Sequence, residues 1–358
     1  MSETQTVLHL VNTMEWGGVR RHVLDLADGL TAHGIRSIIA AWLPEQDPLH
    51  DDVRTVHLPL YAAAGGRKSP SGFLDSLRIL RELIQGEQVQ ILHMHSRYAT
   101  MLGSLAARGS RVRRLYTAHN TFDDMRWLPW YPDDIIAPGA AVRDHFLAHA
   151  RASDSRRLHV VAHGVTIPAL PSIALDQSAR FCFAGRLCEE KGVRVLYDAL
   201  LLLQKERDCL PFVDVIGDGP LFHWLEERVA SNFESGTVRL HGYVRDTAPL
   251  IAGATALLFP SLGLDSAPYT PLEAMALGIP VIASDIRILA QLVLPGLTGR
   301  TFPVGDAAAL ASALSQAMNE RERMRSMGLR GRELVREEHD MLRMCAETAD
   351  VYRQLPRK

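Results

Sequence analysis

Two basic and two acidic residues in the C-terminal half have types and spacings that suit a phosphate-bearing ligand. Arg186 and Lys191 lie five residues apart in a glycine-flanked segment, Gly-Arg-Leu-Cys-Glu-Glu-Lys-Gly. A planar guanidinium and a flexible ammonium in one loop could both reach a diphosphate. Asp265 and Glu273 lie eight residues apart, and both could face the same crevice.

The acidic pair belongs to a predicted strand–loop–helix–strand segment. An apolar run of strand length stops at Pro260, a loop carries Asp265, and a short helix opens near Pro271 and closes at Gly278. Ligands of open parallel sheets bind at the carboxyl ends of the strands, where a helix N-terminus favours a phosphate. The residues expected at this helix start are Thr270, Pro271 and Leu272.

Structural roles for these charged residues stay open at this point. Thr270-Pro271-Leu272-Glu273 also fits a capping box with proline at the first helical position. Arg186 and Lys191 could instead form surface charge pairs with Glu189 or Glu190, which is the less favoured alternative.

Glycine turns follow two other predicted strands. Gly17 and Gly18 separate a strand at 7–11 from a helix at 19–30, and Gly217 and Gly219 follow a strand at 211–216. Glycine lets a backbone approach a ligand closely, although a plain tight turn explains such pairs as well. After a further strand, Tyr243 could stack on a base or simply pack, and Val244 follows it.

Histidine is concentrated in the first half, where 12 of the 15 histidines precede residue 164. His93 and His95 share one face of a predicted strand, because side chains alternate there. With no carboxylate or third histidine at a ligand spacing, a core or cleft role is favoured and no metal is expected. His119 ends another strand and should place its imidazole over the crevice, unless it makes only a local hydrogen bond.

Length and composition restrict the class of protein. A chain of 358 residues suits two domains, and 47% hydrophobic residues with a net charge of -2 indicate a folded protein that does not bind nucleic acid. The four cysteines show no zinc or disulfide spacing. The polar N-terminus does not resemble a signal peptide and no stretch is long enough to span a bilayer, so a cytoplasmic location is expected.

The alternation of strand and helix patterns predicts an α/β fold of two Rossmann-like domains. The boundary is expected in the Pro- and Ser-rich stretch after His163-Gly164-Val165, which divides the chain into domains at 1–168 and 169–340. An amphipathic helix is predicted at 341–355. Other predicted strands are 37–42, 53–58, 90–95, 115–118, 134–137, 159–162, 180–184, 238–244 and 297–302, and other predicted helices are 72–85, 193–204 and 306–318.

Several of these segments together resemble the family 4 glycosyltransferases, which are retaining enzymes of the GT-B fold. Glu273 and the sequence Glu-Ala-Met-Ala-Leu-Gly-Ile-Pro-Val-Ile-Ala-Ser that it begins are similar to the donor-site signature of the family. The Gly-Arg-x-x-x-x-Lys-Gly element, the Thr-x-His ending at His119 and His163-Gly164-Val165 also match. The chain departs from the pattern at Asp265, where glutamate is usual, and at 266–268, where Ser-Ala-Pro replaces Gly-Phe-Gly.

The resemblance implies two domains facing across a cleft and transfer of a sugar from a nucleotide-sugar donor, such as a UDP- or GDP-sugar, to a glycan, lipid-linked or small-molecule acceptor. In that role Arg186 and Lys191 would hold the leaving diphosphate, Glu273 the ribose hydroxyls, and Asp265 and His119 the transferred sugar. Gly217, Gly219, Tyr243 and Val244 would line the nucleotide pocket, and helix 341–355 would cross back onto the first domain. No metal cofactor is implied.

Other interpretations are a nucleotide-sugar epimerase of GT-B-like fold and a nucleotide-sugar-binding pseudoenzyme, the latter suggested by Asp265 and the altered loop. A basic and aromatic cluster could touch an anionic membrane surface or a lipid-diphosphate acceptor, or it could be a solvated patch. Its residues are Arg108, Arg111, Arg113, Arg114, Arg126, Trp127 and Trp130.

Overall fold

The computed structural model describes residues 4–15, 17–43, 53–60, 69–119, 132–149, 157–170, 179–207, 210–263 and 268–355. The chain divides into two compact units, one of residues 1–164 with 341–358 and the other of residues 165–340. The division falls between Gly164 and Val165, four residues before the predicted boundary at 168. Each unit is an α/β body, as the alternating sequence pattern predicts.

The first unit is built on a seven-stranded sheet in the order β3-β2-β1-β4-β5-β6-β7. All neighbouring strands run parallel, and His9 of β1 lies opposite His93 of β4 in the register. The strand order reverses direction between β1 and β4. The strands are β1 (Gln5–Thr13), β2 (Ile35–Trp42), β3 (Arg54–His57), β4 (Ile91–Met94), β5 (Arg113–Thr117), β6 (Asp134–Ala137) and β7 (Leu158–Val160).

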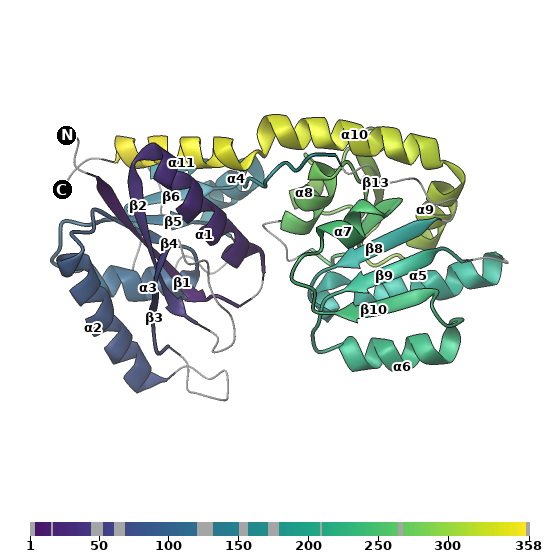
Figure 1. The fold of residues 1–358 in the computed structure, drawn as a ribbon, viewed down its shortest axis with the longest axis horizontal. Helices are drawn as coiled ribbons and strands as arrows, with labels where there is room; N and C mark the ends of the chain where they lie inside the picture. Colours follow the sequence, from purple (N-terminus) through teal and green to yellow (C-terminus); the bar gives the residue numbers. More distant parts are fainter. Residues whose placement is uncertain are drawn as a thin grey trace. The chain divides into compact units, whose positions relative to one another are not determined.

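Helices cover both faces of this sheet (Figure 1). On one face α1 packs with the C-terminal helix α11, and on the other α2 packs against α3. Gly103 of α3 allows that helix to approach Leu92, Met94 and Leu10, since a Cβ there would lie about 3 Å from each of these side chains. The helices are α1 (Gly18–Gly29), η1 (Leu30–His33), α2 (Pro70–Gly86), α3 (Arg97–Ala106), α4 (Ala140–His149) and α11 (Met341–Gln354).

Helix α11 belongs to the first unit, although it is the last element of the chain. Its buried residues Met344, Cys345 and Tyr352 pack in one apolar cluster with Leu26 and Leu30. Gly29 leaves room for this contact, because a Cβ there would lie 2.4 Å from the Sγ of Cys345. The amphipathic pattern at 341–355 is thus explained by burial of its apolar face.

The second unit is built on a six-stranded parallel sheet in the order β10-β9-β8-β11-β12-β13. The strands are β8 (Arg180–Ala184), β9 (Phe212–Ile216), β10 (Val238–Gly242), β11 (Ala256–Phe259), β12 (Val281–Ser284) and β13 (Gly299–Phe302). The helices are η4 (Glu189–Lys191), α5 (Val193–Glu206), α6 (Phe222–Asn232), α7 (Ala248–Ala252), α8 (Tyr269–Ala276), η5 (Arg287–Leu289), α9 (Ala307–Asn319) and α10 (Arg321–Glu338).

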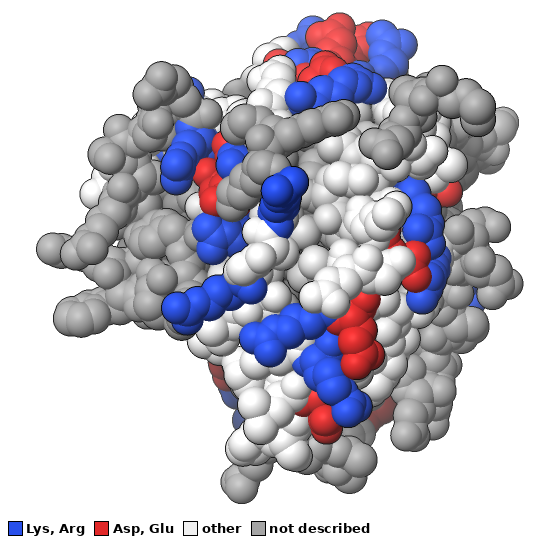
Figure 2. Space-filling view, turned by 90° about the vertical axis from the view of Figure 1, so that its left-hand side faces the viewer, with Lys and Arg blue, Asp and Glu red and all other residues white. Residues whose placement is uncertain are grey.

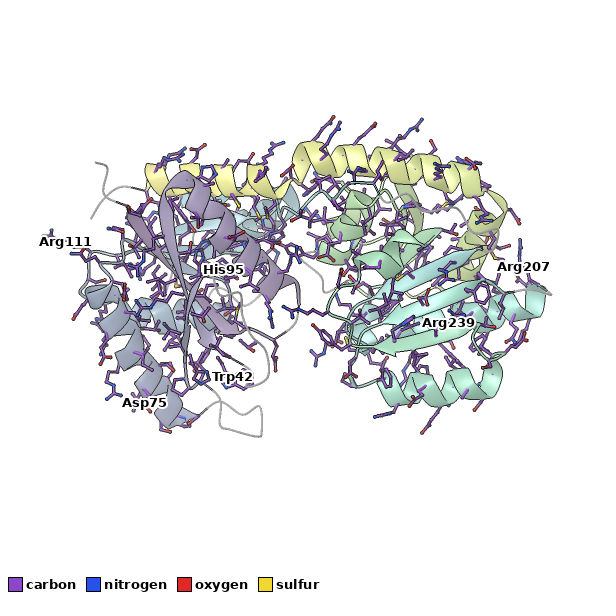
Figure 3. All side chains as sticks on the ribbon, in the orientation of Figure 1. Trp42, Asp75, His95, Arg111, Arg207 and Arg239 are labelled. Atoms are coloured by element: carbon purple, nitrogen blue, oxygen red, sulfur yellow. The ribbon has the colours of Figure 1, made fainter. Side chains whose placement is uncertain are left out.

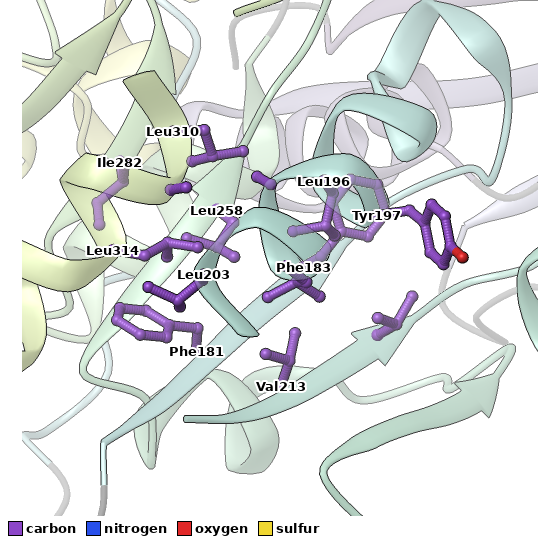
Figure 4. Packing of buried hydrophobic residues seen from close by; sticks show 14 of the residues in the cluster. Phe181, Phe183, Leu196, Tyr197, Leu203, Val213, Leu258, Ile282, Leu310 and Leu314 are labelled. Carbon is purple, nitrogen blue, oxygen red and sulfur yellow. The ribbon is translucent and has the colours of Figure 1, made fainter. Parts of the chain in front are cut away.

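Side chains that alternate along these strands form two cores. Phe181, Phe183 and Leu258 point to one face, where they pack with residues of α5, α6 and α9 (Figure 4). Cys182 and Leu257 point to the other face and pack with residues of α7, α8 and α10. Both faces of the sheet are covered, which explains why the strands are nearly continuous apolar runs.

Helix α10 was not predicted, and its composition explains the omission. Its 18 residues are rich in arginine and glutamate, and its buried face includes Met324, Met327, Gly328 and Gly331. Gly328 lies so close to the loop after α8 that a Cβ would be 2.0 Å from the carbonyl oxygen of Gly278. Because this contact is made by glycines, which carry no side chain, the sequence of α10 shows little apolar periodicity. Among the described residues, no helix combines the length and the apolar character needed to cross a membrane.

Replacing Gly29 by alanine tests the packing of α11. The new methyl group would overlap the Sγ of Cys345, so we expect Gly29→Ala to destabilise the first unit by about 1–3 kcal/mol. The second substitution Cys345→Ala removes the overlapping atom and should recover at least half of that loss. Hydrogen exchange of β1 amides measures both effects.

Gly86→Ala is the matched control, because a Cβ at Gly86 meets nothing within 4 Å. Its effect should stay within about 0.5 kcal/mol. Equal exchange rates in Gly29→Ala and Gly86→Ala would contradict the packing of α11 against α1.

Candidate functional site

The strand order of the second unit reverses between β8 and β11, and such a switch point marks the ligand crevice of open α/β sheets. The loop after β8 carries Arg186 and Lys191, and the loop after β11 leads to α8 with Glu273. The geometry of these two loops therefore decides what the crevice can bind.

The two loops are locked together through their backbones. Gly192 has a φ of +68° and lies so close to Pro260 that a Cβ would be 1.9 Å from the Pro260 carbonyl oxygen. Leu262 N–H donates to the carbonyl oxygen of Glu190 at 2.8 Å, and Ser261 Oγ donates to the same oxygen at 3.1 Å. These contacts hold the segment with the two cations beside the end of β11.

A similar contact joins the loops after β8 and β9. Gly217, with a φ of +135°, would place a Cβ 1.9 Å from the carbonyl oxygen of Gly185. Gly219 would place one 2.5 Å from the carbonyl oxygen of Leu187, whose N–H donates to Asp218 O at 2.9 Å. Both glycines are thus required by backbone contact inside the unit, a reason that the sequence alone did not reveal.

The alternative charge pairs of the two cations are only partly formed. Glu189 pairs with Arg194 at 2.7 Å. The Glu190 carboxylate accepts hydrogen bonds from the Glu190 N–H and from the Cys188 side chain, and these bonds hold the pKa of Glu190 below its ordinary value. The charges of Arg186 and Lys191 lower this pKa further by smaller amounts. Arg186 is exposed and forms no ion pair with the residues that the structure describes. The Lys191 ammonium lies 5.4 Å from the centroid of the Phe259 ring.

The capping-box interpretation of Glu273 is wrong. Helix α8 begins at Tyr269 rather than near Pro271, its N-cap is Pro268, and no side chain caps it. Thr270 lies inside the first turn, so its hydroxyl is not in the capping position. The early start has a physical reason, because Pro268 donates no hydrogen bond and already accepts one from Leu272 N–H at 3.2 Å.

Other predicted residues of this crevice lie at the same edge of the sheet. Glu273 and Thr270 are half-buried, and Pro271 and Leu272 are buried. Tyr243 is 48% exposed and follows β10 together with half-buried Val244. Asp265 lies outside the described residues.

The first unit has a different arrangement at its own switch point. Six buried histidines come together there, and one of them, His95, is labelled in Figure 3. The ring of His95 lies 4.2 Å from that of His93 and 5.4 Å from those of His9 and His22, between ring centroids. The members of this histidine cluster are His9, His22, His93, His95, His119 and His163.

Hydrogen bonds join three of the histidines into a row. His119 Nε2 lies 3.2 Å from His95 Nδ1, and His95 Nε2 lies 3.1 Å from His9 Nδ1. His9 Nε2 in turn lies 3.3 Å from Ser37 Oγ. Each neutral imidazole donates once and accepts once, so the row has a single direction of donation. His119 Nδ1 is buried and has no hydrogen-bond partner among the described residues.

The remaining histidines have different surroundings. His93 is held by two hydroxyl groups, with 2.7 Å from Nδ1 to Tyr352 Oη and 2.7 Å from Nε2 to Thr117 Oγ1. His163 stacks on His119 with 5.1 Å between ring centroids and an interplanar angle of 2°. His22 packs edge-on against both rings, at 4.7 Å from His119 and 5.0 Å from His163.

Burial keeps five of the six imidazoles, those of His9, His22, His93, His95 and His119, neutral at ordinary pH. It lowers the pKa of His9 to about 3 and holds the pKa values of His22, His93, His95 and His119 well below 6.5. Neighbouring imidazoles add to this effect for the latter four. A neutral imidazole has one nitrogen with an available lone pair, so the cluster is a set of nitrogen bases in an apolar interior.

Sequence reasoning found only part of this cluster. It placed His93 and His95 on one strand face and His119 at a strand end, but it missed His9, His22 and His163 as their partners. His9 comes from β1, His22 from α1 and His163 from the segment after β7, so no spacing along the chain shows them as partners. The predicted glycine pair begins the helix that carries His22, since Gly17 is the N-cap of α1 and Gly18 is its first residue.

The predicted basic cluster is divided by the fold. Arg113 pairs with Asp134 at 2.7 Å and Arg114 with Asp133 at 2.9 Å, so both act within the sheet. Arg108 and Arg111 are exposed. Lys and Arg side chains gather on the face of the molecule in Figure 2, some of them beside acidic side chains. Residues 126, 127 and 130 lie outside the described part of the chain.

Two parallel α/β units with glycine-rich loops at their switch points define the class as the GT-B fold. The model of Glycosyltransferase Family 4 matches residues 16–167, and that of Glycosyl transferases group 1 matches residues 178–320. A crystal structure of HepE from Anabaena with UDP and glucose has the same fold, with a TM-score of 0.80 at 17% identity over 98% of this chain and 99% of that one.

Sequence relatives identify the family. A phosphatidyl-myo-inositol mannosyltransferase from Mycobacterium leprae is 30% identical over 333 residues, which cover 83% of each chain. An alpha-maltose-1-phosphate synthase from Mycolicibacterium smegmatis is 26% identical over 324 residues, 75% of this chain and 80% of the relative. The chain therefore belongs to glycosyltransferase family 4, and it is a glycosyltransferase.

The histidine cluster should make the first unit sensitive to acid. In the unfolded chain the His9 imidazole has a pKa near 6.5, whereas in the folded protein its pKa is lowered to about 3. Between these two values only the unfolded chain binds the proton. Stability is therefore complete above about pH 6.5 and falls as the pH drops toward 3. A single imidazole of this kind lowers the free energy of unfolding by roughly 2 kcal/mol at pH 5.

Hydrogen exchange of β1 and β4 amides between pH 7.5 and 5, in EDTA and corrected for intrinsic rates, measures this loss for the first unit alone. His9→Gln should reduce the loss by roughly 2 kcal/mol, because one titrating group is gone. His223→Gln, which alters an exposed histidine of the second unit, should change nothing. A loss equal in all three proteins would refute a contribution from His9.

Proposed function

We propose that the chain is a retaining glycosyltransferase that moves a sugar from a UDP- or GDP-sugar to a hydroxyl group of a glycan, lipid-linked or small-molecule acceptor. One observation carries this proposal. Arg186 and Lys191 stand in a loop whose backbone is locked, through Gly192, against the end of β11 at the switch point of the sheet. A locked loop holds its cations in place before a ligand arrives, which favours binding of a diphosphate.

The two cations would stabilise the leaving group. When a glycosidic bond breaks through an oxocarbenium-like transition state, negative charge accumulates on the departing nucleoside diphosphate. Arg186 and Lys191, with the start of α8, would face that charge. Because two positive side chains supply the neutralisation, we infer that the diphosphate needs no divalent metal ion.

The other predicted residues have roles that follow from the family resemblance. Glu273 would accept hydrogen bonds from the ribose hydroxyls, and Asp265 from a hydroxyl of the sugar. Tyr243 and Val244 would lie against the base. His119, in the first unit, would contact the transferred sugar through Nδ1, because its Nε2 is engaged by His95.

Retention of anomeric configuration would result from attack on the face of the sugar that the diphosphate leaves. The acceptor oxygen forms its bond to the anomeric carbon while the bond from that carbon to the diphosphate oxygen breaks. The acceptor proton passes to an oxygen of the departing diphosphate. This scheme needs no carboxylate nucleophile from the protein.

A lipid-linked acceptor would bring the first unit to a membrane surface. The 30% identical relative is named for transfer to phosphatidyl-myo-inositol, which supports an acceptor of this kind. Exposed Arg108 and Arg111 offer positive charge to anionic lipid.

Removing either cation should abolish most of the transfer activity. We expect Arg186→Gln and Lys191→Ala each to lower kcat by about 100- to 1000-fold, the effect of losing one preorganised donor. The melting temperature should change little for Arg186→Gln, since this side chain is exposed. Arg228→Gln, which removes an exposed cation from α6, is the control and should keep full activity. Near-normal turnover in both cation variants would remove the proposed role.

Donor binding should not depend on divalent metal ions. A calorimetric titration with UDP, GDP and their sugars should give the same Kd, within about twofold, in EDTA and in Mg²⁺ or Mn²⁺. Loss of binding in EDTA would contradict neutralisation by the two cations. Product analysis without acceptor supplies a further check, because an altered sugar configuration would indicate an epimerase.

A further inference from the structure

The histidine cluster contains a group of side chains whose arrangement suits a metal ion. His22, His95 and His119 each offer one ring nitrogen, and these nitrogens all lie within 4.8 Å of one another. All three side chains are at least 95% buried. Three nitrogen ligands converging in an interior are uncommon, because each imidazole has polar atoms that must be satisfied.

The distances are close to those of a tetrahedral site. With Zn–N bonds of about 2.0–2.1 Å, two ligands of a tetrahedral ion lie roughly 3.3 Å apart. His95 Nδ1 and His119 Nε2 are already 3.2 Å apart. The His22 nitrogen lies within 4.8 Å of both, so it has to approach them by at most about 1.5 Å to complete such a set.

A second possible triad, His9, His93 and His95, is less suited to a metal ion. Its nitrogens also lie within 4.8 Å of one another. However, both nitrogens of His93 are held at 2.7 Å by hydroxyl groups, those of Tyr352 and Thr117. Those hydrogen bonds satisfy His93 fully, so a metal ion there would have to displace one of them.

The surroundings of the first triad include the support that metal-binding histidines need. A ligating histidine usually donates its other N–H to an acceptor, which fixes the ring. With His95 Nδ1 on the ion, His95 Nε2–H can donate to His9 Nδ1 at 3.1 Å, and His9 Nε2–H to Ser37 Oγ at 3.3 Å. The row of hydrogen bonds then acts as the outer support of the site.

We propose that His22, His95 and His119 bind a divalent zinc ion, or an ion of similar ligand preference. Neutral imidazoles without a carboxylate favour borderline metals such as zinc over Mg²⁺ or Ca²⁺. Three histidines and one remaining position match zinc sites that keep a water molecule. The ion joins α1 to the ends of β4 and β5, three elements that meet at the switch point of the first unit.

This site is separate from the proposed chemistry at the diphosphate, which involves residues of the second unit. Metal binding by the first unit and metal-independent donor binding by the second are therefore measured by different titrations. The two proposals share only His119, and His22 has no place in the transfer site.

The test uses the full chain without a polyhistidine tag. The protein is treated with EDTA, desalted, loaded with Zn²⁺ and passed through a gel-filtration column before its metal content is measured. We expect one Zn²⁺ per chain, and competition with a chromophoric chelator gives the Kd. His22→Gln, His95→Gln and His119→Gln should each weaken binding at least 100-fold.

Matched variants distinguish this site from its alternatives. His57→Gln removes an exposed histidine of the same unit and should leave the Kd within twofold. Loss of Zn²⁺ from His9→Gln and His93→Gln with retention in His22→Gln and His119→Gln would place the ion in the other triad and overturn the assignment. Binding that survives all three ligand variants would show adventitious surface binding only.

A measurement on the wild-type protein guards against variants that fail to fold. X-ray absorption of the Zn²⁺-loaded chain should show about three imidazole nitrogens in the first shell, and Co²⁺ in place of Zn²⁺ should give the visible spectrum of a four-coordinate ion. A first shell of oxygen atoms alone would refute the proposal. Each variant is accepted only if its circular dichroism and its UDP binding match the wild type.

Discussion

The second unit depends on the close approach of backbones at its switch point. The carbonyl oxygens of Pro260 and Gly185 occupy the space where residues 192 and 217 would carry a Cβ, so both positions must be glycine. Any side chain there would push the loop after β8 away from its neighbours by more than an ångström. Arg186 and Lys191 stand between these two contacts, and their location is therefore set by steric exclusion more than by attraction to a partner.

This constraint explains why the loops that carry the proposed site residues of the second unit could be predicted from the sequence. The glycines that flank the cations and the helix after β11 are formed by residues close together in the chain, so each is visible as a motif or an apolar pattern in the sequence. The apolar run predicted to stop at Pro260 corresponds to β11, and the helix predicted at 306–318 corresponds to α9, which Asp306 caps by accepting from Ala309 N–H. Helix α8 begins at Tyr269, two residues before the predicted start near Pro271. Its N-cap is Pro268, which has no side-chain acceptor and therefore gives no capping signal in the sequence.

What could not be predicted depends on contacts between distant segments. Helix α10 packs through Gly328 and Gly331, and an absent side chain gives no periodic signal. The partners of His93 and His95 come from β1, α1 and the segment before Val165, so their proximity depends on the strand order and on how α1 and that segment pack at the end of the sheet. The acidic partners of Arg113 and Arg114 are likewise supplied by the start of β6, which converts half of a predicted surface patch into structural ion pairs.

The two units have similar parallel α/β architectures, but their switch points carry different groups, which are charged in the second unit and neutral in the first. In the second unit the cations lie in half-buried or exposed loops, where charge is solvated until an anion arrives. In the first unit the bases are buried, and desolvation keeps them neutral. A neutral nitrogen base binds a diphosphate poorly but is a good ligand for a borderline metal ion. A guanidinium binds a diphosphate well and offers no lone pair to a metal ion. Burial thus distinguishes the two switch points chemically, and the two proposals, a diphosphate bound without metal in the second unit and a metal ion among the histidines, are compatible.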